Sequence, residues 1–250
     1  MEENMYPYPY YMRQPPSILT SKQGDVNGDG IPDHVYLIGQ KPDGSTSPFT
    51  TEITLVIQDG RTNAAYSIPL ESNAGYQPSL FLGDFNGDQV DDILISINSG
   101  GSGGFGYYYV YSFLNNQAKE LFDYKKFDDS FVYDVIYRDY YKVDVVNRTL
   151  NLTYTIDIQN RGKDYLSEIY QPDGTLKEPI EGWVSGLNVL YPIDFQGDGV
   201  YELFVFQEIS GRYHADGLGV VQTPLSWDGS KFSVMNNTQY VAIYGASPEQ

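Results

Sequence analysis

One short acidic segment recurs three times and limits what this chain can fold into. It reads Gly-Asp-Val-Asn-Gly-Asp-Gly-Ile-Pro-Asp over residues 24–33, Gly-Asp-Phe-Asn-Gly-Asp-Gln-Val-Asp-Asp over residues 83–92, and Asp-Phe-Gln-Gly-Asp-Gly-Val-Tyr-Glu over residues 194–202. Numbered from the first Asp, each copy offers side-chain oxygens at positions 1, 3, 5 and 9, and position 7 can add a backbone carbonyl. This spacing is typical of loops that bind a hard cation.

Calcium is the cation that this donor set favours. It accepts roughly six to eight oxygen ligands in flexible geometry, whereas magnesium requires strict octahedral coordination and retains several waters. The sequence therefore predicts three calcium sites, of which the first two follow the pattern more closely than the third. The predicted ligands are Asp25, Asn27, Asp29, Ile31, Asp33, Asp84, Asn86, Asp88, Val90, Asp92, Asp194, Gln196, Asp198, Val200 and Glu202.

The residues that follow each loop predict strands. An EF-hand needs a Glu at position 12 and a helix on each side. Here position 12 is Tyr36, Ile95 or Val205, each inside a short run rich in β-branched and aromatic residues. The loops are thus expected to join strand to strand. The alternative is that the Asn-Gly-Asp and Gly-Asp-Gly sequences are only hairpin turns.

This pattern resembles the calcium-loop β-propeller repeats known as FG-GAP or VCBS repeats, which also occur in integrin head domains. The resemblance rests on Gly-Asp-Val/Phe-Asn-Gly-Asp followed by Asp and an apolar strand. The chain departs from it in lacking the Phe-Gly element before the loop and in having Gln89, Gln196 and Glu202 where Gly, Asn and Asp are usual. A positive φ at position 6 would cost Gln89 about 1 kcal/mol. The resemblance implies a propeller fold and a binding role.

The strand pattern predicts an all-β, β-propeller-like fold of about four four-stranded blades. We expect the units at residues 17–75, 76–128, 129–185 and 186–250, in one domain over residues 17–250. Calcium loops would lie between the first two strands of blades 1, 2 and 4. The third unit is inferred from the longer spacing before the last loop and has no ligand pattern. Five short blades or an open β-sandwich are the alternatives.

The N-terminal residues 1–16 differ in composition from the rest of the chain. They are rich in Tyr and Pro, which predicts a flexible or extended arm. We consider two interpretations, a leader without structure and a docking segment of the kind found on structural coat proteins. Neither a signal peptide nor a membrane span is apparent in the sequence.

Charge and composition limit the classes of molecule that this protein is expected to bind. The formal net charge of −18 disfavours nucleic acid, and the absence of Cys excludes disulfides and thiolate chemistry. The expected partner is a protein or a glycan bound on a propeller face. If the calcium sites are as weak as those of extracellular modules, they need a calcium-rich setting. We therefore favour an extracellular, cell-surface or spore-surface location despite the lack of a visible signal peptide.

The sequence predicts no catalytic residue and no organic cofactor. The only histidines, His34 and His214, lie outside any metal-ligand spacing, and no nucleophile-elbow motif is present. The expected function is non-catalytic: adhesion, surface assembly or ligand binding by a calcium-stabilised protein. The alternative is a polysaccharide-binding lectin or a glycan-active enzyme, because acidic and Tyr residues on one face could bind sugars.

Overall fold

Short strands with alternating burial form most of the chain. The structure, a computed structural model, describes residues 15–42 and 46–245, so residues 1–14 of the predicted arm lie outside the described residues. In β2 (Asp33–Gln40) the side chains of Val35 and Leu37 are fully buried, whereas those of Tyr36 and Ile38 are partly exposed. This two-residue period places one face of the strand on the core. The predicted all-β class is confirmed, with only short helical segments.

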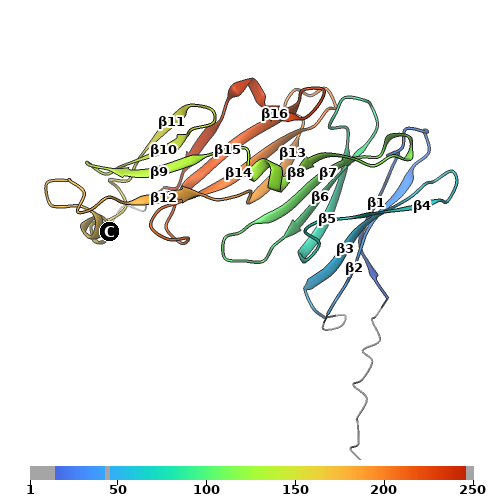
Figure 1. Ribbon diagram of the computed structural model, residues 1–250, viewed down its shortest axis with the longest axis horizontal. Helices are drawn as coiled ribbons and strands as arrows, with labels where there is room; N and C mark the ends of the chain where they lie inside the picture. Colours follow the sequence, from blue (N-terminus) through green and yellow to red (C-terminus); the bar gives the residue numbers. More distant parts are fainter. Residues whose placement is uncertain (1–14, 43–45, 246–250) are drawn as a thin grey trace, which may run out of the picture.

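The first sheet has eight strands in two antiparallel meanders, β1–β4 and β5–β8 (Figure 1). The meanders join where Phe49 and Thr50 of β3 pair with Tyr76 and Gly75 of β5. The strand order is β1-β2-β3-β5-β6-β7-β8, and β4 pairs with β3. In addition to β2, the strands are β1 (Ser17–Gly24), β3 (Phe49–Gln58), β4 (Ala65–Pro69), β5 (Gly75–Gly83), β6 (Asp92–Asn98), β7 (Gly106–Ser112) and β8 (Lys119–Asp123).

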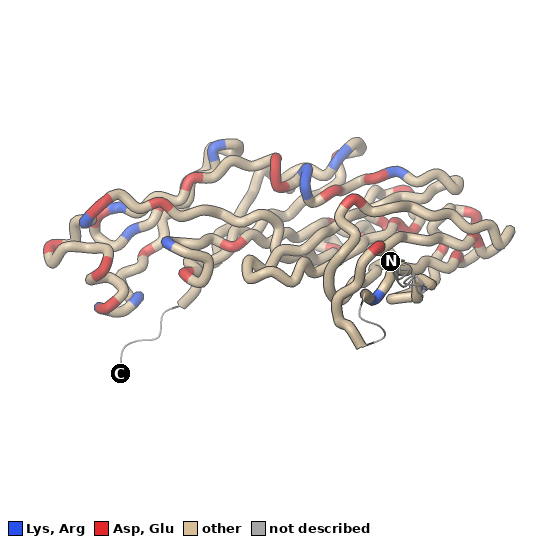
Figure 2. Tube along the Cα trace, turned by 60° about the horizontal axis from the view of Figure 1, so that its bottom comes forward, with Lys and Arg blue, Asp and Glu red and all other residues tan. Residues whose placement is uncertain are grey.

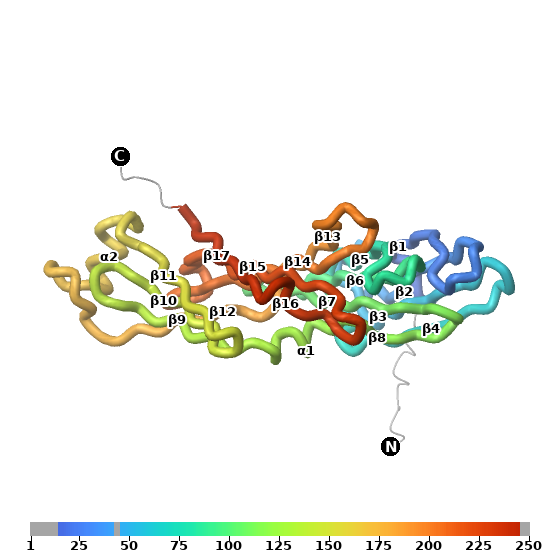
Figure 3. The backbone as a smooth tube through the Cα atoms, turned by 90° about the horizontal axis from the view of Figure 1, so that it is seen from above, coloured from blue at the N-terminus to red at the C-terminus, as the bar shows by residue number. Residues whose placement is uncertain are grey.

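The second sheet has nine strands in the order β11-β10-β9-β12-β14-β15-β16. Two further strands pair beside this path, β13 with β14 and β17 with β15. The two sheets lie end to end in an elongated molecule (Figure 3). The strands are β9 (Tyr133–Arg138), β10 (Lys142–Asn147), β11 (Leu152–Asp157), β12 (Glu181–Val184), β13 (Val189–Ile193), β14 (Glu202–Ser210), β15 (Gly217–Trp227), β16 (Phe232–Val234) and β17 (Tyr240–Ile243).

The predicted four separate blades are replaced by these two sheets. The strands of the first two predicted units do form four-stranded meanders, but β3 pairs with β5 and so joins them at their edges. In the same way, β12 pairs with both β9 and β14 and joins the last two units. The physical reason is that an unpaired strand edge exposes backbone donors and acceptors. Here neighbouring units satisfy these groups directly, strand against strand.

The hydrophobic core continues from one sheet into the other. Phe85, which follows β5, is fully buried. Its ring centroid lies 5.9 Å from that of Tyr201 and 6.5 Å from that of Phe232, two residues of the C-terminal half. A second apolar cluster fills the far end of the nine-stranded sheet, around Val143 and Val145. Because apolar burial is the main favourable term in folding, the shared cluster at Phe85 holds the sheets together.

Over residues 15–42 and 46–245, four short helical segments connect the strands. Among the described residues, no helix is long and apolar enough to cross a membrane. In α1 the first turn is capped by Asp123, which accepts the Lys125 N–H at 2.8 Å. The segments are η1 (Leu114–Asn116), α1 (Tyr124–Asp128), α2 (Lys163–Ile169) and η2 (Met235–Asn237).

The carboxylate of Asp128, at the end of α1, ties the two halves of the chain together. It accepts the backbone N–H of Leu187 at 2.7 Å. Burial raises the pKa of Asp128 from 3.8 to about 6, and the Leu187 N–H only partly offsets this shift. Because the pKa is raised on folding, the stability contribution is complete below the unfolded value and is lost as the pH rises through about 6.

We therefore expect Asp128→Asn to stabilise the protein at pH 8 by roughly 1–2 kcal/mol, a value discounted for partial exposure. Asn retains an oxygen that can accept the Leu187 N–H, and it carries no charge to desolvate. The gain should shrink towards zero at pH 4, where Asp128 is protonated in the folded protein. Urea unfolding of both proteins at several pH values measures this. A gain that does not change with pH would contradict the assignment.

Candidate functional site

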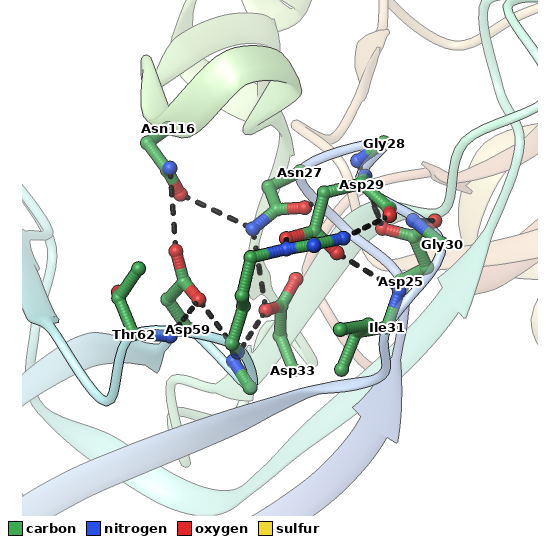
Figure 4. A network of polar contacts seen from close by, with 12 residues as sticks. Asp25, Asn27, Gly28, Asp29, Gly30, Ile31, Asp33, Asp59, Thr62 and Asn116 are labelled. Carbon is green, nitrogen blue, oxygen red and sulfur yellow. Dashed lines mark hydrogen bonds and ion pairs between the residues drawn. The ribbon is translucent and has the colours of Figure 1, made fainter.

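The three acidic segments adopt the same turn. In the first loop Asp25 accepts the backbone N–H groups of Gly28 and Gly30, each at 2.8 Å (Figure 4). Asp84 accepts the equivalent N–H groups in the second loop and Asp194 accepts those in the third. The first residue of each segment therefore organises its own loop, whether or not a cation is bound.

Position 6 of each loop lies in the left-handed region of φ. The φ angles are 80° at Gly30, 66° at Gln89 and 88° at Gly199. The expected positive φ at Gln89 is confirmed, and it costs about 1 kcal/mol that glycine would avoid. The second loop accepts this strain because the N–H of Gln89 is one of the donors to Asp84, at 2.8 Å.

The carboxylate at position 9 of each loop accepts hydrogen bonds from residues at the start of that loop. Asp33 is fully buried and accepts the Val26 N–H at 3.1 Å and the Asn27 side-chain amide at 3.3 Å. The same two bonds recur at Asp92 and at Glu202.

The two residues by which the third loop departs from the repeat pattern, Gln196 and Glu202, form a hydrogen bond with each other. Gln196 donates to Glu202 at 2.9 Å, as the shorter Asn27 does to Asp33 at 3.3 Å. Each partner is one methylene longer than its counterpart, so the amide–carboxylate bond is kept. The two substitutions therefore preserve the geometry of the loop.

The residue types fit a hard cation, but their present positions only partly do. Carboxylate and amide oxygens stand at positions 1, 3, 5 and 9 of every loop. Within the described part of the chain, however, no group of three or more His, Cys, Asp or Glu side chains is arranged to hold a metal ion. The carboxylates of positions 1 and 9 accept backbone N–H groups of their own loop instead. Metal binding would require these side chains to turn towards one another.

The first loop carries its own positive charge. Arg61, from the β3–β4 turn, donates to the Asp29 carboxylate and to the Asp29 carbonyl, both at 2.7 Å. The hydrogen bond from Arg61 lowers the pKa of Asp29. Gly60 in the same turn donates to Asp33 at 2.9 Å, and Asn116 of η1 bridges Asn27 and Asp59. The β3–β4 turn therefore packs against the first loop through these hydrogen bonds.

Two neighbouring carboxylates of the second loop, those of Asp91 and Asp92, have raised pKa values. Burial raises the pKa of Asp92 from 3.8 to about 7, although the Phe85 N–H opposes the shift. Burial also raises the pKa of Asp91, and the neighbouring charges of Asp25 and Asp84 add to that effect. In the third loop, by contrast, backbone N–H groups led by that of Gly199 lower the pKa of Asp194. Negative charge is therefore most costly at the second loop.

Backbone hydrogen bonds stack the three loops in series. The carbonyl of Asp25 accepts the Asp91 N–H at 3.1 Å, and the carbonyl of Asp84 accepts the Tyr201 N–H at 2.7 Å. In both cases position 1 of one loop binds position 8 of the next. The third loop therefore follows the second in space, and the predicted unit at residues 129–185 does not lie between them. That segment instead contributes β9–β12 at the far end of the second sheet.

A sequence signal for this stacking exists in the residue before position 1. It is Gly24 in the first loop and Gly83 in the second, and a Cβ at either would come within 3 Å of the neighbouring loop or strand. In the third loop the same position is Ile193. Glycine therefore stands before each loop on which another loop packs. Isoleucine stands before the third loop, on which no further loop of the series packs.

The Tyr residues near 107–111 and 137–141 are mostly buried. In β7 the side chains of Tyr108 and Tyr109 belong to the core, and Tyr111 is also buried. Of the second cluster, Tyr137 is buried and Tyr140 is 66 % exposed. The Tyr residues of β7 therefore offer little exposed surface to the glycan-binding alternative.

A polar cluster in the second half was not predicted from the sequence. The buried carboxylate of Asp216 accepts hydrogen bonds from Arg161 at 2.9 Å and from the hydroxyls of Tyr165 at 3.0 Å and Tyr137 at 3.3 Å. Burial raises the pKa of Tyr137 strongly. Because α2 supplies Tyr165 and the β14–β15 turn supplies Asp216, the cluster fastens that helix to the sheet. No motif signals it, since its members are far apart in sequence.

These features define an all-β protein with a series of three stacked aspartate-rich loops. The model of the YybI C-terminal domain family matches residues 131–241. The protein described as "Uncharacterized protein YybI" from Bacillus subtilis (strain 168) is 48% identical over 242 residues, which cover 96% of this chain and 91% of that protein. The chain therefore belongs to the YybI family. No solved structure matches it.

The stacking predicts that Gly83→Ala destabilises the protein. The added Cβ would lie 2.9 Å from the rings of Phe81 and Tyr201, which would have to move. Overpacking of this kind costs about 1–3 kcal/mol. Gly101→Ala is the matched control, because no atom lies within 4 Å of the added group. Thermal unfolding of both variants tests this, and equal melting temperatures would contradict the stacked arrangement.

Proposed function

We propose that this chain is a non-catalytic, calcium-binding protein that serves adhesion, surface assembly or ligand binding. The observation that carries the proposal is the threefold occurrence of one loop geometry with oxygen donors at the same positions. The carboxylates that hold each turn together also offer the oxygen atoms that calcium prefers as ligands. The ligands are the fifteen residues at positions 1, 3, 5, 7 and 9 of the loops.

The electrostatics of the second loop support a bound cation. Asp91 and Asp92 have raised pKa values because their charges are partly desolvated and close to other carboxylates. A divalent cation would offset this cost, since opposite charge favours the ionised carboxylate. The whole chain is acidic, and Figure 2 shows Asp and Glu along its full length with Lys and Arg more sparse. Bound cations would lower this self-repulsion.

The first loop would bind calcium in competition with its own arginine. Arg61 already neutralises Asp29, so a cation there would have to displace the guanidinium. This ion pair is exposed, with 55% of the Arg61 side chain accessible, and exposed pairs contribute little stability. Displacement of Arg61 is therefore inexpensive, and the loop keeps its oxygen donors.

The proposal includes a relationship to calcium-loop propeller repeats. Each acidic loop joins the first two strands of a meander, β1–β2, β5–β6 or β13–β14. This is the position that the repeat resemblance implies. An extracellular, cell-surface or spore-surface setting is part of the proposal, because weak calcium sites fill only where calcium is abundant.

A thermal melt in EDTA and in millimolar calcium, with magnesium as the control, tests calcium binding. At ten times Kd each site contributes about 1.4 kcal/mol, so three sites should raise Tm by roughly ten degrees. The triple variant Asp25→Ala, Asp84→Ala and Asp194→Ala should lose this shift. A second triple variant at exposed positions, Asp129→Ala, Asp164→Ala and Glu178→Ala, removes the same charge and should retain it. No calcium-specific shift in the natural chain would refute the proposal.

A second candidate function is glycan binding. A groove of about 570 Å³ lies beside the second loop. Trp227 supplies an aromatic surface there, and Asn86, Asn115 and Gln117 supply amide groups. Sugars are bound by such combinations, because the ring stacks on the sugar and the amides bind its hydroxyls.

If this groove binds glycans, Trp227→Ala should weaken binding at least tenfold on a glycan array. Tyr240→Ala is the control, because Tyr240 is an exposed aromatic residue of β17 outside the groove. Hydrolysis of any glycan would replace the non-catalytic proposal with an enzymatic one. Equal binding by both variants would exclude the groove as the site.

A further inference from the structure

The second sheet contains a buried polar cluster around the side-chain amide of Gln239, which lies directly before β17. Gln239 is 5% exposed, and Thr223 of β15 and Asn147 of β10 are fully buried. Tyr133, the partly buried first residue of β9, completes the cluster. Buried polar groups need hydrogen-bond partners inside the protein. The cluster therefore holds a carboxamide, a hydroxyl and a phenol in fixed positions relative to one another.

Each polar atom of the Gln239 side chain has its own partners. Its Nε2 donates to Thr223 Oγ1 and to Tyr133 Oη, both at 2.7 Å. Its Oε1 accepts the side-chain amide of Asn147 at 3.1 Å. The Thr223 hydroxyl is also within hydrogen-bonding reach of the Tyr133 hydroxyl. A threonine hydroxyl, a proton-carrying phenol and a donor to the carbonyl oxygen therefore meet at one carboxamide.

We propose that Thr223 and Gln239 become joined by an intramolecular ester bond, which the protein makes itself after it has folded. Oγ1 of Thr223 attacks Cδ of Gln239, the bond between Cδ and Nε2 breaks, and the nitrogen leaves as ammonia. The threonine proton passes to Tyr133 Oη, and the tyrosine proton passes to the leaving nitrogen. Tyr133 is therefore unchanged at the end, and the reaction needs no oxidant and no second reactant.

The contacts match the requirements of acyl transfer. A threonine hydroxyl is a weak nucleophile and has to lose its proton as it attacks. Tyr133 can accept that proton and release its own, because it contacts both the nucleophile and the leaving nitrogen. Asn147 donates to the oxygen on which negative charge develops, as the donors of an oxyanion hole do. Tyr133 and Asn147 are thus the catalytic residues of the proposed reaction.

Fixed geometry and burial favour the formation and survival of the ester. Well-oriented groups within one molecule react as if they were present at effective concentrations of about 10⁵–10⁸ M. The burial of Thr223 and Gln239 limits access of the water that would hydrolyse the product. The ammonia is diluted into the solvent, which draws the reaction towards the ester.

The ester would join the segment that begins β17 covalently to β15. β17 is a strand of four residues, and it pairs with β15 from Gly219↔Ile243 to Gln222↔Tyr240. A strand with so few pairing residues opens easily. The chain has no cysteine, so a disulfide cannot hold this strand in place. The proposal depends neither on calcium binding nor on glycan binding.

Peptide mapping of the full chain by mass spectrometry tests the proposal. Trypsin cleaves after Arg212 and after Lys231, so Thr223 and Gln239 fall on two different peptides. The ester would keep these two peptides together, with a mass lower than their sum by one molecule of ammonia. Mild alkali should then separate them and leave a carboxylate on the former Gln239 side chain, because hydrolysis of an ester gives an acid and an alcohol.

Three substitutions and one control identify the reacting groups. Thr223→Val should abolish the linked peptides, whereas Thr223→Ser keeps a nucleophile and should retain them. Tyr133→Phe should slow the accumulation of linked peptides in freshly made protein by at least about tenfold, because it removes the proton relay. Thr238→Val is the matched control, since the Thr238 hydroxyl donates to the Asn236 carbonyl instead.

Two results would overturn the proposal. One is a natural chain whose two tryptic peptides remain separate even after prolonged incubation of the folded protein. In that case the cluster would be an ordinary hydrogen-bonded network. The other is a linkage that persists in Thr223→Val, because it would have to use a different nucleophile.

Discussion

The hydrogen bond from the Tyr201 N–H to the Asp84 carbonyl is the contact on which the arrangement of the molecule depends. It joins the loop of the second meander to a loop more than a hundred residues later, and thereby sets the first sheet against the second. The aromatic core at Phe85 forms around this contact. An equivalent bond between Asp25 and Asp91 shows that the same interaction is used twice. The fold is thus built by stacking loops, and strand pairing then joins neighbouring meanders at their edges.

This construction brings carboxylates of successive loops close together. Each loop supplies carboxylates, and stacking brings Asp91 of one loop near Asp25 of another. The first loop offsets its charge with Arg61, and the third uses backbone N–H groups around Asp194. The second loop has the buried Asp92 with a pKa of about 7, so it is where a cation would relieve the largest electrostatic cost. The groove proposed to bind glycans lies beside this same loop.

Sequence reasoning located the loops, their flanking strands and the left-handed φ at Gln89, because these depend on contacts within a few residues. It also grouped the strands into meanders. It was wrong about separate blades, since pairing of Phe49 with Tyr76 joins two meanders and no local pattern reveals which edge remains free. It missed the cluster at Asp216 for a related reason. Asp216 binds Arg161 and Tyr165, whose spacing along the chain is irregular.

The sequence by itself determined the all-β class, the three acidic turns and the donor atoms available in each, since strand periodicity and Asx turns arise from neighbouring residues. Tertiary structure alone decided that the third loop stacks on the second, that residues 129–185 extend the far end of a sheet, and that Phe195 is exposed where Phe85 is buried. These outcomes depend on which of the three acidic loops pack against each other. That choice is set by the packing of segments distant in sequence, such as Phe85 on Tyr201.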